Sequence, residues 1–562
     1  MKMSTKGKAI YLHYLFLLFF LFLLFPGWFF QMPQTGQEAS ADIAIHLARK
    51  HHLLFGRDVR LPYGPMGVLH SRLPIAVNLL TYLFFDLYFL LTAFFILRRI
   101  LADHFHYTVV AFLVLTLGLT MRLGLDDWFF FFVLFYLFAY LRNPEKPAYL
   151  LLAAFPAAVG LFFRVDIGLL GVAIFLATLC YAWLRRLLPL KTWVLSSLFF
   201  LLVVGVAGWI LHVDCIGYLV TRLHLSGAVE SRYQPSPAKD GLLFHLALEI
   251  LLCMIYCTVC LIGVAIVRKD WRKRSDEIFA CVVATLSALF YFKAGFLRVD
   301  EALWRFFGIS VLLAALLYLF GPSDGWRKVP VLCCWIILVL CGLGVFLGKK
   351  PELPFDGITN GSFFKTRAKE IKRYLAGIGR YGGAAADLEA QTTASNPLKA
   401  LAGSQSTDIL SWEVSTLYFN GLNYLPRPTV QSFYTYNGWL DSLNYSRYLS
   451  PEAPANVLLS FDVVENHSAF FDEPRTKLAL LDSYEPETDY DNNLLLKNAR
   501  QRRLTPAGES TVNVRLNEDI NIAPDDALQY SRFFIRYDSR GKLGRWFDQP
   551  PGLQIVLTLG DE

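Results

Sequence analysis

The chain has 562 residues, of which 55% are apolar and only 18% are charged. Soluble domains have roughly 45–50% apolar and about 25% charged residues, so this composition excludes an ordinary soluble protein and a disordered chain. The apolar excess lies in residues 9–348, whereas residues 349–562 have the composition of a water-soluble domain. The net charge of +7 does not indicate a nucleic-acid partner, because most basic residues lie beside apolar segments. We therefore predict a multi-pass membrane protein with a soluble C-terminal domain.

The N-terminal part contains a series of apolar segments that we predict to be membrane spans, because a spanning helix needs about 20 mostly apolar residues. The eleven predicted spans are residues 9–31, 73–97, 106–124, 127–141, 147–163, 166–184, 192–213, 242–267, 277–296, 304–321 and 329–348. The first is too long for the apolar core of a signal peptide and lacks a small-residue cleavage site, so we expect it to remain uncleaved. The short segments 147–163 and 166–184 could also form one bent re-entrant unit.

Lysine and arginine residues beside the spans indicate the orientation of the chain. If the N-terminus is cytoplasmic, every connection on the inner side is basic, as the positive-inside rule requires. The eleventh span then places residues 349–562 outside the membrane. The predicted architecture is an all-α membrane domain over residues 1–348, a linker with a helical segment over 349–407, and an extracytoplasmic domain over 408–562.

Most of the remaining charged residues of the membrane part lie on its outer side. Charges at membrane depth are costly and usually face a cavity or a partner. The residues that gather there are Asp42, Asp58, Asp126, Asp127, Asp166, Asp300 and Glu301, together with Arg122, Arg164, Lys293, Arg298 and Arg305. This composition is typical of a polar cavity that handles a charged molecule.

The first outer loop, residues 32–72, is too long for a simple turn and is therefore a functional candidate. Asp42, His46 and Arg49 are spaced at i, i+4 and i+7, which places them on one face of a predicted short helix. Asp42 could instead act only as a cap at the start of that helix. The glycines and prolines of Gly56–Gly67 predict a rigid, closely packed turn that returns to the second span.

This layout resembles the GT-C superfamily of polytopic glycosyltransferases, which use lipid-phosphate-linked sugars. The resemblance covers roughly residues 9–350 and rests on Asp42 after the first span, the amphipathic helix, the segment Gly56–Gly67 and the acidic pair Asp126–Asp127 after the third span. The segment Tyr63-Gly64-Pro65-Met66-Gly67 also resembles uncharacterised bacterial multipass proteins with the same layout. The resemblance implies a location in the bacterial plasma (inner) membrane.

The resemblance also implies roles for the acidic residues. Asp42 matches the first-loop acid and would accept the proton of the acceptor. Asp126 and Asp127 match the second acidic position, which binds the acceptor, the donor end or, in some branches, a divalent ion. We expect only one of these adjacent carboxylates to face the site, and Asp126 or Asp127 could instead cap the fourth span. No cofactor is certain, a divalent metal is possible, and no metal ligand is assigned.

The departing phosphate needs positive charge, because stabilising developing charge is usually the largest catalytic contribution. Arg298 and Arg305, with Lys293 nearby, are the best candidates, and Arg164 is a second choice that could simply pair with Asp166. Each of these cations could instead extend to lipid headgroups or form internal ion pairs. We further expect support of the acceptor or the loop from His46, Arg49, Arg57, Asp58 and Tyr63.

The C-terminal domain is predicted to be α/β or mostly β. Its basic segment 365–380 favours a helix, and a Gly/Ala/Thr/Ser-rich linker follows at 377–407. The aromatic and amide residues of 408–436 could form a sugar-stacking surface or the core of a small α/β unit. Alternating patterns at 512–516, 533–537 and 553–557 predict strands.

The leading functional prediction is a membrane glycosyltransferase that moves a sugar from a polyprenyl-phosphate-linked donor to a glycan, lipid or protein acceptor on the outer face. The alternatives are a transporter or flippase for a lipid-linked saccharide, and a non-catalytic protein of envelope-glycan assembly. A transporter predicts inverted repeats and broken helices near the midplane. No repeat is evident, and no motif indicates ATP binding, dinucleotide binding, zinc proteolysis or serine hydrolase chemistry.

Overall fold

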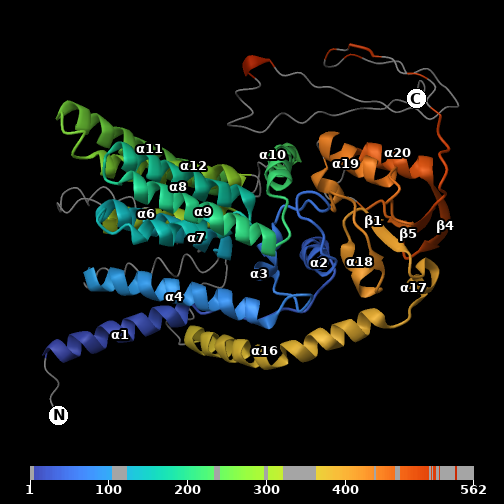
Figure 1. The fold of residues 1–562 in the computed structure, drawn as a ribbon, viewed down its shortest axis with the longest axis horizontal. Helices are drawn as coiled ribbons and strands as arrows, with labels where there is room; N and C mark the ends of the chain where they lie inside the picture. The colour runs from blue at the N-terminus through green and yellow to red at the C-terminus, as the bar shows by residue number, and fades with distance from the viewer. Residues whose placement is uncertain are drawn as a thin grey trace.

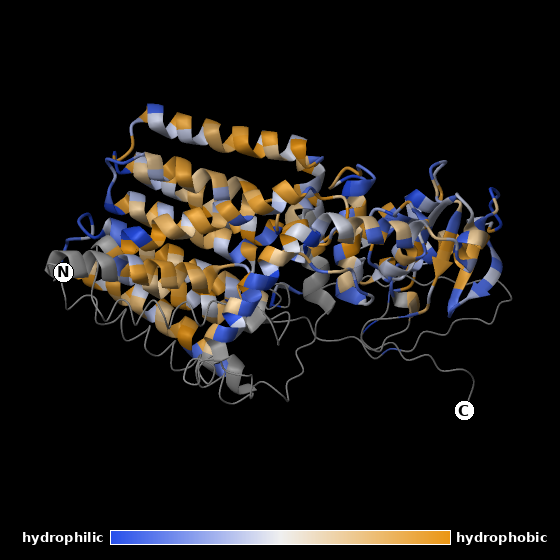
Figure 2. Cartoon of the chain, turned by 90° about the horizontal axis from the view of Figure 1, so that it is seen from below, coloured by the Kyte–Doolittle hydropathy of each residue, from blue (hydrophilic) through white to orange (hydrophobic). Residues whose placement is uncertain are grey.

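The computed structural model describes residues 5–103, 123–232, 241–296, 302–320, 362–435, 438–462 and 469–505, with a few isolated positions after 505. Two regions are evident in Figure 1: a bundle of long helices and, at one end of it, a smaller region built around a sheet. The bundle helices are mostly hydrophobic along their length, whereas hydrophilic and hydrophobic residues mix in the sheet region (Figure 2). The chain is therefore mostly helical, with a small sheet in its C-terminal part.

The bundle is formed by apolar helices that run back and forth. They are α1 (Thr5–Leu24), α4 (Leu79–Asp103), α6 (Leu125–Arg142), α7 (Ala148–Gly160), α8 (Val165–Leu184), α9 (Leu190–Ile210), α11 (Gly241–Val267), α12 (Ser275–Phe296) and α13 (Ala302–Phe320). Helix α6 is buried at every residue from Asp127 to Leu141. A helix that is apolar all round belongs inside a bundle, so α6 is the central helix, and its first turn carries the predicted acidic pair.

Five helices of the described part are long and apolar enough to cross a membrane: α4, α8, α9, α11 and α12. Large hydrophobic side chains remain exposed on them, as on Leu198, Leu202 and Val259, which is compatible with contact to lipid. The apolar helical stretches His13–Leu24, Ala148–Gly160 and Arg305–Phe320 are shorter. The described residues thus do not confirm eleven spans, and the predicted spans 106–124 and 329–348 lie almost entirely or entirely outside them.

The connections at one end of the bundle are structured (Figure 1). The first loop contains α2 (Gln37–Lys50), η1 (Pro65–Gly67) and α3 (Val68–Ser71), and the connection after α9 contains α10 (Cys215–Arg232). Helix α10 was not predicted, because its sequence mixes polar and apolar residues too evenly to read as a span. The segments 147–163 and 166–184 form two separate helices, α7 and α8, joined by a short turn.

A 32-residue helix, α16 (Ser362–Thr393), joins the bundle to the C-terminal sheet. It continues through the glycine- and alanine-rich residues that were expected to form a linker. Its buried residues Tyr381 and Leu388 continue the buried stripe of the preceding turns. Packing of one face therefore outweighs the helix-weakening effect of glycine, which is roughly 1 kcal/mol per residue.

The C-terminal sheet has the strand order β2-β1-β3-β5-β4. Strand β1 is parallel to β2 and β3, whereas β5 is antiparallel to β3 and β4. The elements of this region are α17 (Pro397–Ala402), β1 (Ser406–Leu410), α18 (Val414–Phe419), β2 (Asn423–Tyr424), η2 (Ser432–Tyr434), α19 (Gly438–Tyr448), β3 (Asn456–Leu459), η3 (Ala469–Phe471), α20 (Pro474–Ser483), β4 (Tyr484–Tyr490) and β5 (Asn493–Asn498). The region is thus α/β, one of the two predicted classes.

The sequence-based assignments inside this domain differ from the structure. The described strands end at Asn498, and the described positions Val512, Asn513 and Arg515 belong to no strand, so the prediction for 512–516 is wrong at those positions. The predicted strands 533–537 and 553–557 lie outside the described residues. Tyr424 and Phe433 are buried, which favours the interpretation of 408–436 as core.

Candidate functional site

Arg305 links the two acids at the start of the central helix. Its Nε donates to Oδ2 of Asp127 at 2.7 Å, and its Nη2 donates to Oδ1 of Asp127 at 2.8 Å and to Oδ2 of Asp126. The Tyr291 hydroxyl donates to Oδ1 of Asp127 at 2.9 Å. Asp127 also accepts the backbone N–H of Gly124 at 3.0 Å, so it caps α6 and binds the arginine at the same time.

A second arginine lies beside this group. Arg164, in the turn between α7 and α8, donates Nη2 to Oδ2 of Asp166 at 2.8 Å and Nε to Oδ1 of the same residue at 3.0 Å. Its Nη1 is 4.0 Å from Oδ2 of Asp126. The predicted pairing of Arg164 with Asp166 is therefore present. We refer to Asp126, Asp127, Arg164, Asp166 and Arg305 as the charged cluster.

The charged cluster is partly open to solvent. The Asp127 side chain is fully buried, whereas Asp126 is 11% exposed and Arg305 is 19% exposed. The two adjacent carboxylates thus differ in exposure, although both accept hydrogen bonds from Arg305. Three carboxylates and two guanidinium groups are present, and among the described residues Nη1 of Arg305 has no hydrogen-bond acceptor. The exposed edge of the cluster includes Asp126 and Arg305.

The first loop is bonded to the turn that precedes Arg164. The backbone N–H groups of Gly64 and Met66 donate to Phe163 and Phe162 at 2.8 and 2.9 Å, in the turn that carries Arg164. Tyr63 lies near Arg164, and its ring stacks on that of His70 with centroids 6.1 Å apart.

Two glycines allow this close approach. A Cβ on Gly64 would lie 2.3 Å from the carbonyl oxygen of Phe162, and one on Gly56 would lie 2.4 Å from the backbone nitrogen of Tyr218. Gly56 also has φ +92°, a left-handed conformation that favours glycine. The segment is the closely packed turn that its glycines and prolines predict.

Asp42 lies on α2, in the first loop. Helix α2 begins at Gln37, so Asp42 is in its second turn and the expectation that it stands at the helix start is wrong. Among the described residues, no hydrogen bond or ion pair reaches the Asp42 carboxyl, and none joins it to Asp126 or Asp127. Burial, with a smaller contribution from the charge of Glu38, raises the pKa of Asp42 to about 7.

The other first-loop candidates occupy different environments. His46 is buried and binds the carbonyl of Ile75 through Nδ1 at 2.7 Å and the hydroxyl of Ser71 through Nε2 at 3.0 Å. Burial lowers its pKa to about 4, so it is neutral at pH 7. Both ring nitrogens are thus used in holding α2 against the end of the loop.

Arg49, Arg57 and Asp58 do not join the charged cluster. Arg49 has Tyr82 of α4 as its electrostatic neighbour. Arg57 and Asp58 form an ion pair of 3.0 Å in which the arginine is 68% exposed. Asp58 also accepts the backbone N–H of Leu54 at 3.0 Å, so this pair stabilises its own turn.

The remaining predicted residues lie near or outside the described site. Lys293 follows Tyr291 by two residues on α12, whereas Arg298 lies outside the described residues.

In the described part of the chain, no group of three or more His, Cys, Asp or Glu side chains is arranged to hold a metal ion. Asp126 and Asp127 share Arg305 as their cation.

The C-terminal domain docks onto the first loop at the start of α2. Oε1 of Glu413 accepts the backbone N–H of Gly36 at 3.1 Å and the hydroxyl of Ser40 at 3.0 Å. Glu413 therefore caps α2 from another domain, where a carboxylate is favoured by the helix dipole. The backbone N–H of Arg60 also donates to the carbonyl of Pro428 at 2.6 Å.

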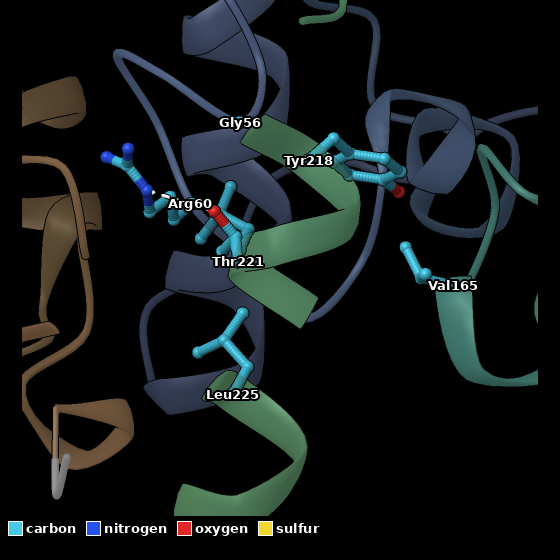
Figure 3. A pocket seen from close by; sticks show the side chains of 7 residues that line it. Gly56, Arg60, Val165, Tyr218, Thr221 and Leu225 are labelled. Carbon is cyan, nitrogen blue, oxygen red and sulfur yellow. Dashed lines mark hydrogen bonds between the residues drawn. The ribbon is translucent and has the colours of Figure 1, made fainter. Parts of the chain in front are cut away.

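A small pocket lies beside this junction, between the first loop, the start of α8 and α10 (Figure 3). Its lining residues are Gly56, Arg60, Leu61, Val165, Tyr218, Thr221 and Leu225. Arg60 donates Nε to the Thr221 hydroxyl at 3.0 Å, and its guanidinium carbon lies 5.7 Å from the ring centroid of Trp439. Val165 stands between Arg164 and Asp166 in the sequence, so the pocket adjoins the charged cluster.

The sequence did not single out Tyr291 or Glu413. Tyr291 carries a single polar hydroxyl in an apolar segment. It precedes Arg305 by 14 residues, but a loop separates their two helices, so the spacing does not predict that the two side chains meet. Glu413 follows a strand that was not predicted. A polar residue near the end of an apolar segment was the only available signal for Tyr291.

Comparison with protein-family models found no match for this chain. Comparisons with curated proteins and with solved structures likewise found no significant match.

Proposed function

We propose that the protein is a GT-C-like membrane glycosyltransferase that moves a sugar from a polyprenyl-phosphate-linked donor to an acceptor. The observation that carries this proposal is the charged cluster at one end of an apolar helix bundle, built around two acids at the start of the central helix. Buried charges are costly to maintain in such surroundings, so their concentration at one end favours a functional site.

Asp42 is the proposed general base. In the proposed step, the acceptor hydroxyl oxygen attacks the anomeric carbon while its proton passes to the Asp42 carboxylate. The bond from the anomeric carbon to the phosphate oxygen breaks, and its electron pair leaves with the polyprenyl phosphate. A pKa of about 7 supports this role, because a base is most effective when its pKa lies near the working pH.

Arg305 and Arg164 are proposed to stabilise the departing phosphate. Their carboxylate partners hold the guanidinium groups in place, and Nη1 of Arg305, which has no acceptor among the described residues, is the proposed donor for a phosphate oxygen. A preoriented donor needs little reorganisation when charge develops. In this proposal Asp126 and Asp127 position the arginines, and Tyr63 lies at the edge of the phosphate site. Lys293 and Arg298 remain candidates for the same role.

In this proposal the substrate bridges Asp42 and the charged cluster. Ile45, one turn after Asp42, lies against the tight turn at Gly67 next to Tyr63, and Tyr63 in turn neighbours Arg164. We propose that the sugar and acceptor occupy the Asp42 side and the phosphate occupies the Arg305 side. The pocket around Arg60 and Thr221 is a candidate contact for the acceptor or the lipid.

The proposed setting is the bacterial plasma membrane, with the charged cluster and the C-terminal domain on its outer face. Support comes from the bundle end nearest the sheet. The first loop, helix α10 and the turn that precedes α8 lie together there (Figure 1). A transporter or flippase for a lipid-linked saccharide is less well supported, since the described charges of this site lie at helix ends instead of midway along helices.

The proposal is tested by comparing cell-envelope glycans from a strain lacking the gene and from the same strain carrying the wild-type gene or the Arg305→Met variant. We expect the deletion to lose one glycan linkage, the wild-type gene to restore it, and the variant, at equal protein level, to fail. Unchanged glycans in the deletion strain would contradict the proposal. Accumulation of the complete lipid-linked saccharide on the inner leaflet would indicate a flippase.

A further inference from the structure

The start of helix α2 is held by side chains of the C-terminal domain. Oε1 of Glu413, between β1 and α18, accepts the backbone N–H of Gly36 at 3.1 Å and the Ser40 hydroxyl at 3.0 Å. The Ser415 hydroxyl donates to the same oxygen, and the backbone N–H of Ser415 donates to Oγ of Ser40 at 3.2 Å. Both serines are fully buried, so these bonds lie in the interior of the contact.

A further bond joins the same two parts of the chain. Nε2 of Gln431, which is buried, donates to the carbonyl of Gln37 at 3.3 Å, and α18 packs against α2. The C-terminal domain therefore contacts the first residue of α2 as well as the residue before it. We refer to the bonds of Glu413, Ser415 and Gln431 with Gly36, Gln37 and Ser40 as the docking contact.

The middle of α2 is fixed from the other side, by the end of the first loop. His46 binds the carbonyl of Ile75 at 2.7 Å and the Ser71 hydroxyl at 3.0 Å. Asp42 lies between the two fixed points, two residues after Ser40 and four before His46. Because a helix rises by about 1.5 Å per residue, Asp42 is only about 3 Å along the axis from Ser40. A displacement of the start of α2 therefore displaces the Asp42 carboxyl.

Helix α2 has no cap of its own at this end. The residue at its N-cap position is Gly36, which has φ +112° and no side chain that could accept the free backbone N–H groups. The first N–H groups of a helix need such an acceptor, and a carboxylate there also interacts favourably with the helix dipole. Glu413 supplies both, so the order of the first two turns, which include Asp42, depends on the docking contact.

We propose that Glu413 is a positioning residue for Asp42: through the docking contact, the C-terminal domain holds the first two turns of α2 and thereby places the proposed general base. The inference rests on the proposed function, because it concerns the role of Asp42 in transfer. It gives the C-terminal domain a part in the reaction, since transfer then requires the docked domain. A base must lie within hydrogen-bond distance of the proton that it accepts, and a misplacement of roughly 1 Å can lower a rate about 100-fold.

The test compares Glu413→Ala and Glu413→Gln with the wild type in the full-length protein. Sugar transfer is measured in proteoliposomes over a range of pH, with polyprenyl-phosphate-linked sugars and an envelope acceptor fraction. Glu413→Ala removes the acceptor of the docking contact, whereas Glu413→Gln keeps a carbonyl oxygen in its place. The matched control is Glu452→Ala, which removes an acid of the same domain that is 78% exposed.

We expect Glu413→Ala to lower the transfer rate about 10–100-fold, Glu413→Gln to restore most of it, and Glu452→Ala to match the wild type. The pH profile separates positioning from a loss of folded protein. Burial, with a smaller contribution from Glu38, raises the pKa of Asp42 to about 7, so the wild-type rate should rise as the pH passes through about 7.

In Glu413→Ala the midpoint of this rise should move toward the ordinary value of 3.8, because a released second turn exposes the Asp42 carboxyl to water. A smaller amount of folded protein alone would lower the rate without moving the midpoint. A lower rate with the wild-type midpoint would therefore overturn the proposal, as would an unchanged rate in Glu413→Ala or an equal loss in Glu452→Ala.

Thermal unfolding tests the positioning without any transfer. The raised pKa of Asp42 makes stability decline as the pH rises through about 7, and this decline should weaken in Glu413→Ala. Absence of transfer by the wild type would contradict the proposed function, while a weakened decline would still support the link between Glu413 and Asp42. An identical decline in the wild type and Glu413→Ala would overturn that link.

Should Glu413→Ala be poorly folded, Ser40→Ala provides the same comparison. It removes the Ser40 hydroxyl from the docking contact while Glu413 keeps its bond to Gly36. We expect a shift of the midpoint in the same direction, but smaller. A rate and a pH profile equal to those of the wild type would contradict the proposed positioning.

Discussion

Arg305 and Asp127, which lie 178 residues apart in the chain, form a two-point ion pair with N–O distances of 2.7 and 2.8 Å. Asp127 is fully buried, so the arginine neutralises a carboxylate that has no access to water. The pair also joins α13 to the start of the central helix α6. The same interaction therefore has a structural effect that can be measured separately from the proposed role in transfer.

Removing the arginine from this pair should destabilise the bundle strongly. Arg305→Met leaves two adjacent carboxylates without their shared cation, and breaking a buried ion pair from one side typically costs about 3–5 kcal/mol. We expect a clear decrease in Tm in detergent. The double variant Arg305→Met with Asp127→Asn should recover part of the loss, because the uncompensated buried charge is gone. A Tm equal to that of the wild type would show that the pair is not formed.

The carboxyl of Asp42 should produce a pH dependence near neutrality. Its folded pKa of about 7 lies above the ordinary value of 3.8, so the protonated form favours the folded state. The resulting stability is fully present below about pH 4 and is lost as the pH rises through about 7. Thermal unfolding of the wild type between pH 4 and 8 should show this decline, and Asp42→Asn should remove it.

Glu38→Gln is the matched control for this measurement, since Glu38 is an exposed acid one turn earlier on α2. It should keep the decline but shift it to slightly lower pH, because the Glu38 charge contributes to the raised pKa of Asp42. Identical pH profiles for the wild type and Asp42→Asn would contradict the assigned environment.

The C-terminal domain should depend on the buried residue Arg427. Its Nε lies 3.1 and 3.2 Å from the two carboxylate oxygens of Glu473, and the Asp408 carboxylate accepts its backbone N–H at 3.0 Å. Arg427→Met should destabilise this domain by about 3–5 kcal/mol, because Glu473 is then left buried and unpaired. Faster hydrogen exchange in β1 and β3 would report the change.

Arg447→Met serves as the control for Arg427→Met. Arg447 pairs with Glu452, which is 78% exposed, and an exposed pair contributes less than about 1 kcal/mol. Equal exchange rates in the two variants would show that the Arg427 network does not stabilise the domain.

Cysteine labelling tests the predicted orientation. None of the nine native cysteines lies after Cys341, so a cysteine introduced at exposed Ser446 is the first in the C-terminal domain. In intact cells, a membrane-impermeant maleimide should label Ser446→Cys and leave Lys146→Cys, in the connection between α6 and α7, unlabelled until the cells are opened. The reverse pattern would place the C-terminal domain in the cytoplasm. Both variants are made in a background without the native cysteines.

Several features of the fold were accessible from the sequence because they depend on local patterns. The long apolar runs predicted the helices from α6 to α13 closely, apart from α10, and the glycines of Gly56–Gly67 predicted a tight turn. Polar residues at the ends of apolar runs identified Asp126, Asp127, Arg164 and Arg305 as candidates. Their gathering at one end of a bundle follows from helices that cross in alternate directions.

Other features depend on contacts that the sequence does not encode locally. The bonds of Arg305 to Asp127 and of Tyr291 to Asp127 join separate helices, so no spacing rule gives them. Glu413 caps α2 from 377 residues away, measured from Gly36. Strands β1 and β3 were missed because they are short and buried at nearly every residue, so they lack a long alternating pattern. Strand β4 was missed because its sequence is mostly polar and contains a proline.

The most direct test of the central claim is sugar transfer by purified protein in proteoliposomes supplied with polyprenyl-phosphate-linked sugars and an envelope acceptor fraction. Asp42→Asn is compared with the wild type and with Glu38→Gln, at equal protein content and equal folding. We predict that Asp42→Asn loses about 10²–10⁴-fold in transfer rate, the usual contribution of one positioned acid–base group, while Glu38→Gln stays near the wild type. Wild-type transfer by Asp42→Asn would contradict the account.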